Sequence, residues 1–448
     1  MAVDLHRLVS PSQWPIPPYP ADGALHALLS NGSSDWSFWD AGVYERHPLH
    51  TTGEPLRFSH IFRAHVLDDV VAEGQSIIVD GVDTRPVSMK NHHDITMLKR
   101  VRREDEWWTG KWGEAGAAVG VDMMRGLFTA GSFSVLVREM QDRVGAIGQL
   151  VSTLEAETRS PCNANLYMTP RDSQGFELHF DWMENIIIQL DGEKTWKLYP
   201  PLLKLPRKGL KFRPDKTAVA ALPPPVTLTL KAGDALYIPR GVLHEAEVTP
   251  AWERSMHLTL GILLNDLTYE GLLHYALSPY ASDLRLTKVL NAALRGAACL
   301  EGGEPLRSAL PVHALIGAEG GEDGVSALNG GHADAIRALK PHLSSPSTAL
   351  WTACDFSAKA AQSENDSNDL YILEPSLFNF LCLGKAEGAG GQGGALSIPE
   401  WEELRRTLVE QLPAALRQLR ADNDANIERR QKLRQQRLER LRKGKDEV

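Results

Sequence analysis

The sequence contains little cysteine, and its cysteines form no paired motif. Cys162, Cys299, Cys354 and Cys382 lie far apart, and no C-x-x-C pair occurs among them. Closely spaced cysteines are typical of zinc sites and disulfide frameworks, so this distribution argues against both and favours a reducing compartment. Cys162 is best explained as a small buried hydrophobic residue.

Long apolar runs are missing as well. No segment reaches the length of a membrane-spanning helix, and the N-terminal stretch Met1-Ala-Val-Asp-Leu-His lacks the continuous apolar region of a secretory signal. We therefore expect no membrane span and no secretion, with a nuclear or nucleolar location in a eukaryote and a cytoplasmic one otherwise. With 448 residues, 43% of them hydrophobic, the chain can build one large core or several smaller ones.

The acidic net charge hides a basic C-terminus. Residues 427–448 carry nine Lys or Arg against four acidic residues, which gives this tail +5 and leaves −14 for the rest of a chain whose net charge is −9. Such a segment could contact RNA or the ribosome, or act as a nuclear address. A solvated terminal helix with Glu–Arg pairs explains the same pattern equally well.

The most informative residues are an H-x-D pair and one later histidine. His179 and Asp181 are two positions apart, so on a β-strand both side chains face the same way while Phe180 packs on the other side. His244 follows the turn-rich segment Gly233-Asp-Ala-Leu-Tyr-Ile-Pro-Arg-Gly. Two imidazoles and one carboxylate on one face of a metal leave three sites open, which is the arrangement of non-haem Fe(II) oxygenases.

A lysine lies between these metal-binding candidates. The pattern predicts a hairpin, with a buried strand at residues 186–190, a turn at Asp191-Gly192 and a return strand at residues 194–199. Lys194 then shares a face with Trp196 and Leu198, where an unpaired ammonium is costly to bury. The C5 carboxylate of 2-oxoglutarate would supply the missing anion. Alternatively, Lys194 extends to the rim as a solvated charge.

Several segments in a fixed order then suggest a family. They are Asn165-Leu-Tyr167-Met-Thr-Pro170, Ser173-Gln-Gly-Phe176, His179-Phe-Asp181, Gln189-Leu-Asp-Gly-Glu-Lys194-Thr-Trp196-Lys-Leu-Tyr199, Gly233-Asp-Ala-Leu-Tyr-Ile-Pro239-Arg-Gly241, His244-Glu-Ala and Ser255-Met-His257-Leu-Thr259, preceded by Phe38-Trp39-Asp-Ala-Gly-Val-Tyr44. Together, over roughly residues 30–315, they resemble the JmjC ribosomal oxygenases, which are Fe(II)- and 2-oxoglutarate-dependent protein hydroxylases of the cupin superfamily.

The resemblance implies a fold and roles for particular residues. The fold would be mixed α+β, a double-stranded β-helix (jelly-roll) barrel with a helical N-terminal flank and a helical C-terminal region. His179, Asp181 and His244 would bind Fe(II), and Lys194 would pair with the C5 carboxylate of 2-oxoglutarate. Asn165 and Tyr167 would line the pocket near this cosubstrate and the substrate side chain, and O2 would be the oxidant.

The same resemblance implies substrates and an assembly. It indicates hydroxylation of a histidine in a ribosomal protein; demethylation of histone lysines, as a chromatin regulator, is the alternative within the same chemistry. An inactive JmjC scaffold is a further alternative, against which the intact ligand set and Lys194 argue. Two departures from the family pattern, Trp182 after the ligand Asp181 and Gly261 where serine is common, touch the pocket wall and therefore the substrate identity.

The expected organisation has five parts. An irregular and helical segment at 1–55 precedes the catalytic domain at 56–265. Residues 266–345 show an apolar helical stripe, and the resemblance implies that they form a homodimer. Residues 346–426 would form a C-terminal, winged-helix-like domain, which the resemblance implies only by their position in the chain. Within them, Ser397-Ile-Pro-Glu400 has the pattern of a capped helix start. The basic tail at 427–448 is expected to be separable.

Overall fold

A computed structural model describes most of the catalytic region and part of the C-terminal region. The described residues are 23–30, 43–74, 78–79, 82–83, 88–103, 106–206, 214, 216–264, 267–277, 306, 308–310, 331–344 and 398–446. The chain divides into two compact units. The first comprises Met1–Leu202, Pro214–Leu263 and Ala425–Val448, and the second comprises Leu203–Arg213 and Leu264–Asp424.

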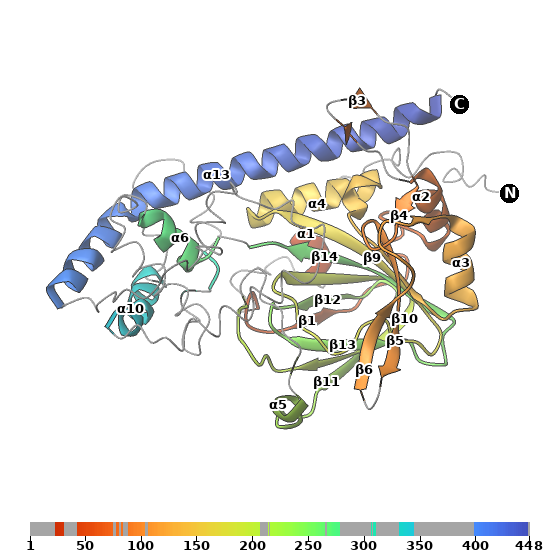
Figure 1. The fold of residues 1–448 in the computed structure, drawn as a ribbon, viewed down its shortest axis with the longest axis horizontal. Coiled ribbons are helices and arrows are strands. Elements are labelled where there is room, and N and C mark those ends of the chain that lie inside the picture. Colours follow the sequence, from red (N-terminus) through yellow and green to blue (C-terminus); the bar gives the residue numbers. More distant parts are fainter. Residues whose placement is uncertain are drawn as a thin grey trace. The chain divides into compact units, whose positions relative to one another are not determined.

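An antiparallel sheet with flanking helices forms the first unit, so the expected mixed α+β class is confirmed at that level (Figure 1). Ten strands are connected in the order β1-β12-β10-β14-β9-β8-β5-β6, with β11 and β13 paired to β10. Their bounds are β1 Leu49–Thr51, β5 Ile95–Arg103, β6 Glu106–Lys111, β8 Ser134–Val137, β9 Cys162–Pro170, β10 Glu184–Tyr199, β11 Val226–Lys231, β12 Ala235–Ile238, β13 Leu243–Glu247 and β14 Arg254–Ile262. Closure of these strands into a double-stranded β-helix barrel stays a prediction.

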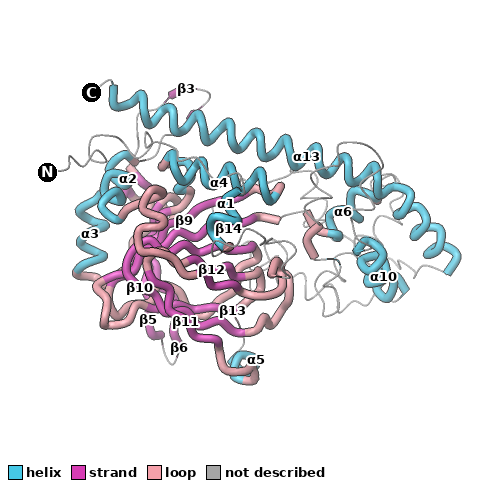
Figure 2. Tube along the Cα trace, turned by 180° about the vertical axis from the view of Figure 1, so that it is seen from behind, coloured by secondary structure: helices cyan, strands magenta, loops and turns pink. Residues whose placement is uncertain are grey.

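Short elements complete this unit. Two small antiparallel pairs are formed by β2 Ile78–Val79 with β3 Val82–Asp83, and by β4 Met89–Lys90 with β7 Ala118–Val119. The helices are α1 Gly23–Leu29, η3 Ala64–Val66, α2 Leu67–Glu73, α3 Val121–Thr129, η4 Met140–Asp142, α4 Gly145–Thr158 and α5 Lys216–Ala220. Figure 2 shows α1 and α4 along one side of the sheet, and their apolar residues share one core with β9, β10 and β14.

The predicted hairpin at residues 186–199 is wrong, because these residues belong to one continuous strand, β10. It runs without a turn from Glu184 to Tyr199: residues 185–188 pair with β12, 193–198 with β11 and 195–199 with β13. A bulge at Leu190 precedes Asp191-Gly192 instead, because the register with β14 shifts between Gln189 and Asp191. Gly192 has a φ of +64°, and a Cβ there would lie 2.0 Å from the carbonyl oxygen of Arg254. The bulge redirects one long strand from the first set of partners to the second.

The second unit is helical where it is described. Helix α6 spans Tyr269–Ala276 and is capped by Thr268, whose side chain accepts a hydrogen bond from the Gly271 amide. The unit also contains α10 Gly331–Ser344 and the first part of α13 Ile398–Asp446, in which Leu404, Leu408 and Leu412 are buried. No described helix is both long enough and apolar enough to cross a membrane.

Several expectations lie outside the described residues. These are the helix at 36–39, the dimer stripe beyond residue 277 and the winged-helix-like segment at 346–397. The tail can be examined in part, because α13 continues through residue 446. The residues from 425 onward belong to the first unit, and the separability of the basic tail stays a prediction.

Candidate metal and cosubstrate site

The structure brings His179, Asp181 and His244 together. His244 lies on β13, and His179 forms a single bridge to it, with backbone N–O distances of 3.2 and 2.8 Å in the two directions. Asp181 lies beyond this bridge rather than on a regular strand, while Phe180 is buried as expected. One donor atom from each of the three residues lies within 4.8 Å of the others. The geometry therefore offers a three-ligand centre on one side.

Backbone carbonyls orient both imidazoles. His179 Nδ1 lies 2.8 Å from the Glu177 oxygen, and His244 Nδ1 lies 3.0 Å from the Val242 oxygen. Because a carbonyl only accepts, each Nδ1 carries the proton and each Nε2 keeps its lone pair for a metal. Asp181 Oδ2 accepts a hydrogen bond from Asn185 Nδ2 at 2.7 Å, so the carboxylate is also held by a neighbour.

Burial keeps His244 in its metal-binding form. Desolvation lowers the pKa of His244 to about 4, with a smaller lowering from the neighbouring His179 and an opposing effect of Asp181. His244 Nε2 lies 3.7 Å from Asp181 Oδ2. The imidazole is therefore neutral at neutral pH and can bind a divalent ion without first losing a proton.

Lys194 is a buried cation without a described anionic partner. It is 6% exposed, and burial lowers its pKa to about 7. Its Nζ donates to Thr169 Oγ1 at 3.1 Å and lies 5.9 Å from the centre of the Trp196 ring. By contrast, Lys197 on the opposite face is partly exposed and lies 3.6 Å from Glu247. This contrast favours the interpretation of Lys194 as an anion-binding residue over a solvated lysine.

Aromatic rings connect the lysine to the metal ligands. Tyr167 stacks on His257 with ring centres 4.9 Å apart, and His257 meets Trp196 edge-on at 5.5 Å. Trp196 in turn lies 6.1 Å from the His244 ring. Burial, together with the charge of Lys194, lowers the pKa of His257 well below its usual value. Two buried polar atoms in this row, Trp196 Nε1 and His257 Nδ1, have no hydrogen-bond partner in the described part of the chain.

Strand β9 supplies the opposite wall. Asn165, Tyr167 and Thr169 alternate along it and therefore share a face. Asn165 Oδ1 accepts a hydrogen bond from the Glu139 amide at 3.2 Å. Burial raises the pKa of Tyr167 well above its usual value, and the negative charge of Asp181 adds to this, so its hydroxyl stays protonated.

Three contributing residues were missed from the sequence. Thr169 continues the alternation of Asn165 and Tyr167, so strand spacing could have identified it. His257 lies in a recognised motif, but its partner Tyr167 is distant in sequence. Asn185 gave no signal, because its contact with Asp181 depends on the chain bend between them.

The departure at Gly261 also has a structural reason. A Cβ at this position would lie 2.5 Å from Asn163 Oδ1 and 2.8 Å from Met183 Sδ. A serine would therefore force one of these neighbours to move. The packing between Asn163 and Met183 therefore requires a glycine at this position.

The residues present fit an iron and 2-oxoglutarate site. Two neutral imidazoles and one carboxylate match a facial Fe(II) centre with open positions. The uncompensated charge of Lys194 and the unpartnered polar atoms of Trp196 and His257 fit a polar anionic molecule beside that centre.

Comparison with known proteins agrees with this geometry. Residues 143–269 match the model of the JmjC domain. The chain is 40% identical over 123 residues to a bifunctional lysine-specific demethylase and histidyl-hydroxylase NO66 of Dictyostelium discoideum, covering 27% of this chain and 23% of that protein. It is 39% identical over 113 residues to ribosomal oxygenase 2 of Rattus norvegicus, covering 25% of this chain and 23% of the relative.

Among solved structures, YcfD of Escherichia coli, a ribosomal oxygenase, aligns with 14% identity and a TM-score of 0.35, over 56% of this chain and 59% of that chain. The chain spans about a quarter of the length of the first two relatives above. All the candidate ligands and Lys194 fall within the matched domain. The chain therefore carries a match to the JmjC domain over residues 143–269, and in this part it is similar to ribosomal oxygenases.

Proposed function

We propose that this chain is an Fe(II)- and 2-oxoglutarate-dependent dioxygenase that hydroxylates a protein side chain. One observation carries the proposal: a complete His–Asp–His donor set shares a side-chain cluster with a buried lysine that has no described anionic partner. A scaffold without activity would have no need for either feature.

The residues would divide the work as follows. His179, Asp181 and His244 would hold iron, and Lys194 with Thr169 would hold the far carboxylate of 2-oxoglutarate. When bound, iron and 2-oxoglutarate supply the oxidation, in which O2 puts one oxygen atom into a substrate C–H bond and the other into succinate, with release of CO2. The aromatic row of Tyr167, His257 and Trp196 would exclude water and orient the cosubstrate.

A histidine of a ribosomal protein is the proposed target. The support comes from the matched relatives, which are named ribosomal oxygenases and a histidyl-hydroxylase. The name of the Dictyostelium relative also includes lysine-specific demethylase, which favours histone lysine demethylation as the second candidate. The same site chemistry serves both, since each begins at a C–H bond held beside the metal.

We further propose a homodimer through the helices that follow the catalytic domain, and a nuclear or nucleolar location if the chain is eukaryotic. The apolar residues Leu272 and Leu273 of α6 are buried within the second unit, so the dimer would depend on the stripe beyond residue 277. Sedimentation at micromolar concentration tests the dimer, and a monomer there would refute it.

Succinate release tests the proposed activity. The purified protein with Fe(II), 2-oxoglutarate and a ribosomal protein extract should form succinate, and mass spectrometry should show an added oxygen atom on one histidine. The matched control is Lys197→Ala, which keeps the three ligands and changes a partly exposed side chain beside Glu247 on the opposite face of β10. A methyl group lost from histone lysine, with no oxygen gained on histidine, would replace the first target by the second. No succinate with either substrate would contradict the proposal.

A further inference from the structure

Strand β9 has strands on both sides over only part of its length. Strand β14 pairs with it from Cys162 to Pro170, whereas β8 pairs only with Leu166, Tyr167 and Met168. Along residues 162–165, no described strand occupies the second edge. Backbone groups on such an edge need other partners, since a buried unpaired amide or carbonyl is costly.

Side chains occupy this edge in place of a strand. Glu155 Oε1 of α4 accepts from the Cys162 amide at 3.2 Å, and Gln141 Oε1 of η4 accepts from the Ala164 amide at 2.9 Å. Arg430 Nη2 of α13 donates to the Cys162 carbonyl at 2.7 Å. The neighbouring helices η4 and α4 and the distant helix α13 therefore complete the hydrogen bonding of one strand segment.

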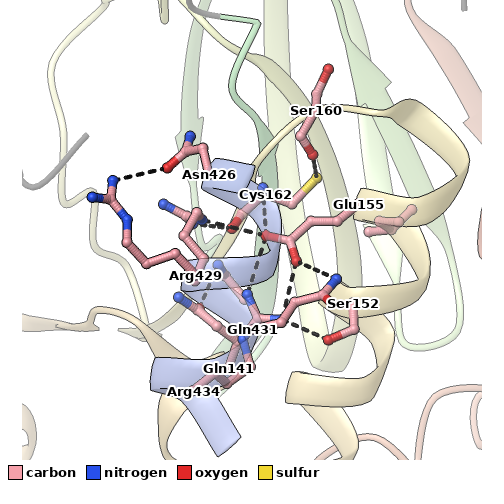
Figure 3. A network of polar contacts seen from close by, with 12 residues as sticks. Gln141, Ser152, Glu155, Ser160, Cys162, Asn426, Arg429, Gln431 and Arg434 are labelled. Carbon is pink, nitrogen blue, oxygen red and sulfur yellow. Dashed lines mark hydrogen bonds and ion pairs between the residues drawn. The ribbon is translucent and has the colours of Figure 1, made fainter. Parts of the chain in front are cut away.

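The basic part of α13 fixes the acid at the centre of this arrangement. Arg434 donates from Nη1 to Glu155 Oε2 and from Nη2 to Glu155 Oε1, both at 3.2 Å, and from Nη1 to Ser152 Oγ at 2.6 Å. Glu155 is 0% and Arg434 4% exposed. Figure 3 shows Arg434 and Gln431 meeting Glu155 beside Cys162. This bidentate contact fixes the orientation of the Glu155 carboxylate and also compensates its charge.

A second series of contacts connects α13 to Asn165 on the wall of the site. Arg437 pairs with Asp142 of η4, beside Gln141. Gln141 also contacts Glu139, whose amide donates to Asn165 Oδ1 at 3.2 Å. Asn165 is the last residue of the edge segment, on the face that it shares with Tyr167 and Thr169.

We propose that the basic C-terminal part of α13 is a positioning element of the catalytic unit, in which Arg430 and Arg434 act through Glu155 to hold the strand-free edge of β9 and thereby place Asn165 on the site wall. Two of the nine basic tail residues are thus committed to this contact rather than to a polyanion. The catalytic consequence rests on the proposed function, whereas the structural consequence does not.

Amide hydrogen exchange in the full-length protein tests the structural consequence. In Arg434→Met, the Cys162 and Ala164 amides should exchange about tenfold faster or more, the factor for loss of one hydrogen bond. The amides of residues 166–168, which lie between two strands, should keep their rates. Arg434→Lys, which retains the charge beside Glu155, should recover most of the protection. Arg429→Met is the matched control, because this exposed neighbour bonds to Asn426 within the helix.

A second variant and a second measurement guard against general loss of stability. Arg430→Met removes the donor to the Cys162 carbonyl and the ion pair with Glu155, and it should speed exchange at the same segment. In both variants the affinity of the metal-loaded protein for 2-oxoglutarate should stay unchanged, because Thr169, which Lys194 of β10 contacts, lies at the other end of β9. Oxygen transfer to a ribosomal protein extract should fall.

Three results would overturn the proposal. They are unchanged exchange at Cys162 and Ala164, equal acceleration across β9 and β14, and a 427–448 deletion that leaves the exchange intact while weakening ribosome binding with salt dependence. The last would identify the segment as a nucleic-acid tail.

Discussion

The site has a metal end, formed by His179, Asp181 and His244, and a lysine end, formed by Lys194 and Thr169, and the two differ in how their polar groups are held. At the metal end, each ligand already has a partner: backbone carbonyls for His179 and His244, and Asn185 for Asp181. At the lysine end, one hydroxyl from Thr169 contacts a buried ammonium whose pKa is lowered to about 7. The three metal ligands are therefore held by hydrogen bonds without an ion, whereas the buried ammonium of Lys194 is destabilised as long as no anion is bound beside it. We therefore expect the lysine end to select a ligand that brings a carboxylate to Lys194.

Breaking the metal end should have the largest effect. His179→Ala or Asp181→Ala removes one of the three ligands, so succinate formation should fall to the background of a metal-free reaction. Circular dichroism and thermal unfolding should show that the fold persists. Turnover retained in either variant would mean that other residues bind the metal.

Breaking the lysine end should raise the demand for cosubstrate. Removing one partner of a buried charge pair costs several kcal/mol, so Lys194→Ala should raise the 2-oxoglutarate concentration for half-maximal rate about a hundredfold. Lys197→Ala is the matched control, because its side chain lies on the other face beside Glu247. If Lys197→Ala had the larger effect, the assignment of the anion partner would be wrong.

Loosening the metal end without removing a ligand should have an intermediate effect. Asn185→Ala deletes the hydrogen bond to Asp181, and loss of such an orienting contact typically costs about 10–100-fold in metal affinity. Competition with a chelator measures this affinity directly. An unchanged affinity would show that Asn185 does not orient the carboxylate.

A change of pH should separate the two ends further. With a pKa of about 7, Lys194 is charged below that pH in the free protein and neutral above it. A bound carboxylate favours the charged form, so binding above pH 7 requires proton uptake. The affinity for 2-oxoglutarate should therefore be flat below pH 7 and fall by about tenfold per pH unit above it. Calorimetry of the metal-loaded protein without oxygen checks this, and Lys194→Met should lose the dependence.

The sequence allowed the site to be predicted better than the fold. His179, Asp181, His244 and Lys194 could be recognised because metal and anion chemistry restrict the residue types at those positions. Asp191-Gly192 suggested a turn, but this dipeptide follows a bulge at Leu190 within one strand, and only the pairing of β10 with β14 distinguishes the two. Local sequence contains no record of that pairing.

The C-terminal helix α13 also shows what local sequence can and cannot predict. The leucines at 404, 408 and 412 follow a helical period, so their burial could be predicted from the sequence. The burial of Arg434 could not be, because a charged residue is buried only where a partner such as Glu155 exists. That partner lies 279 residues away in the chain.

Incorporation of labelled oxygen tests the central claim most directly. The protein should be incubated with isotopically labelled O2, Fe(II), 2-oxoglutarate and ribosomal proteins, beside the Asp181→Ala variant. Our account predicts one labelled oxygen atom on a histidine in the first sample and none in the second. Label absent from every protein side chain, or present equally in both samples, would contradict it.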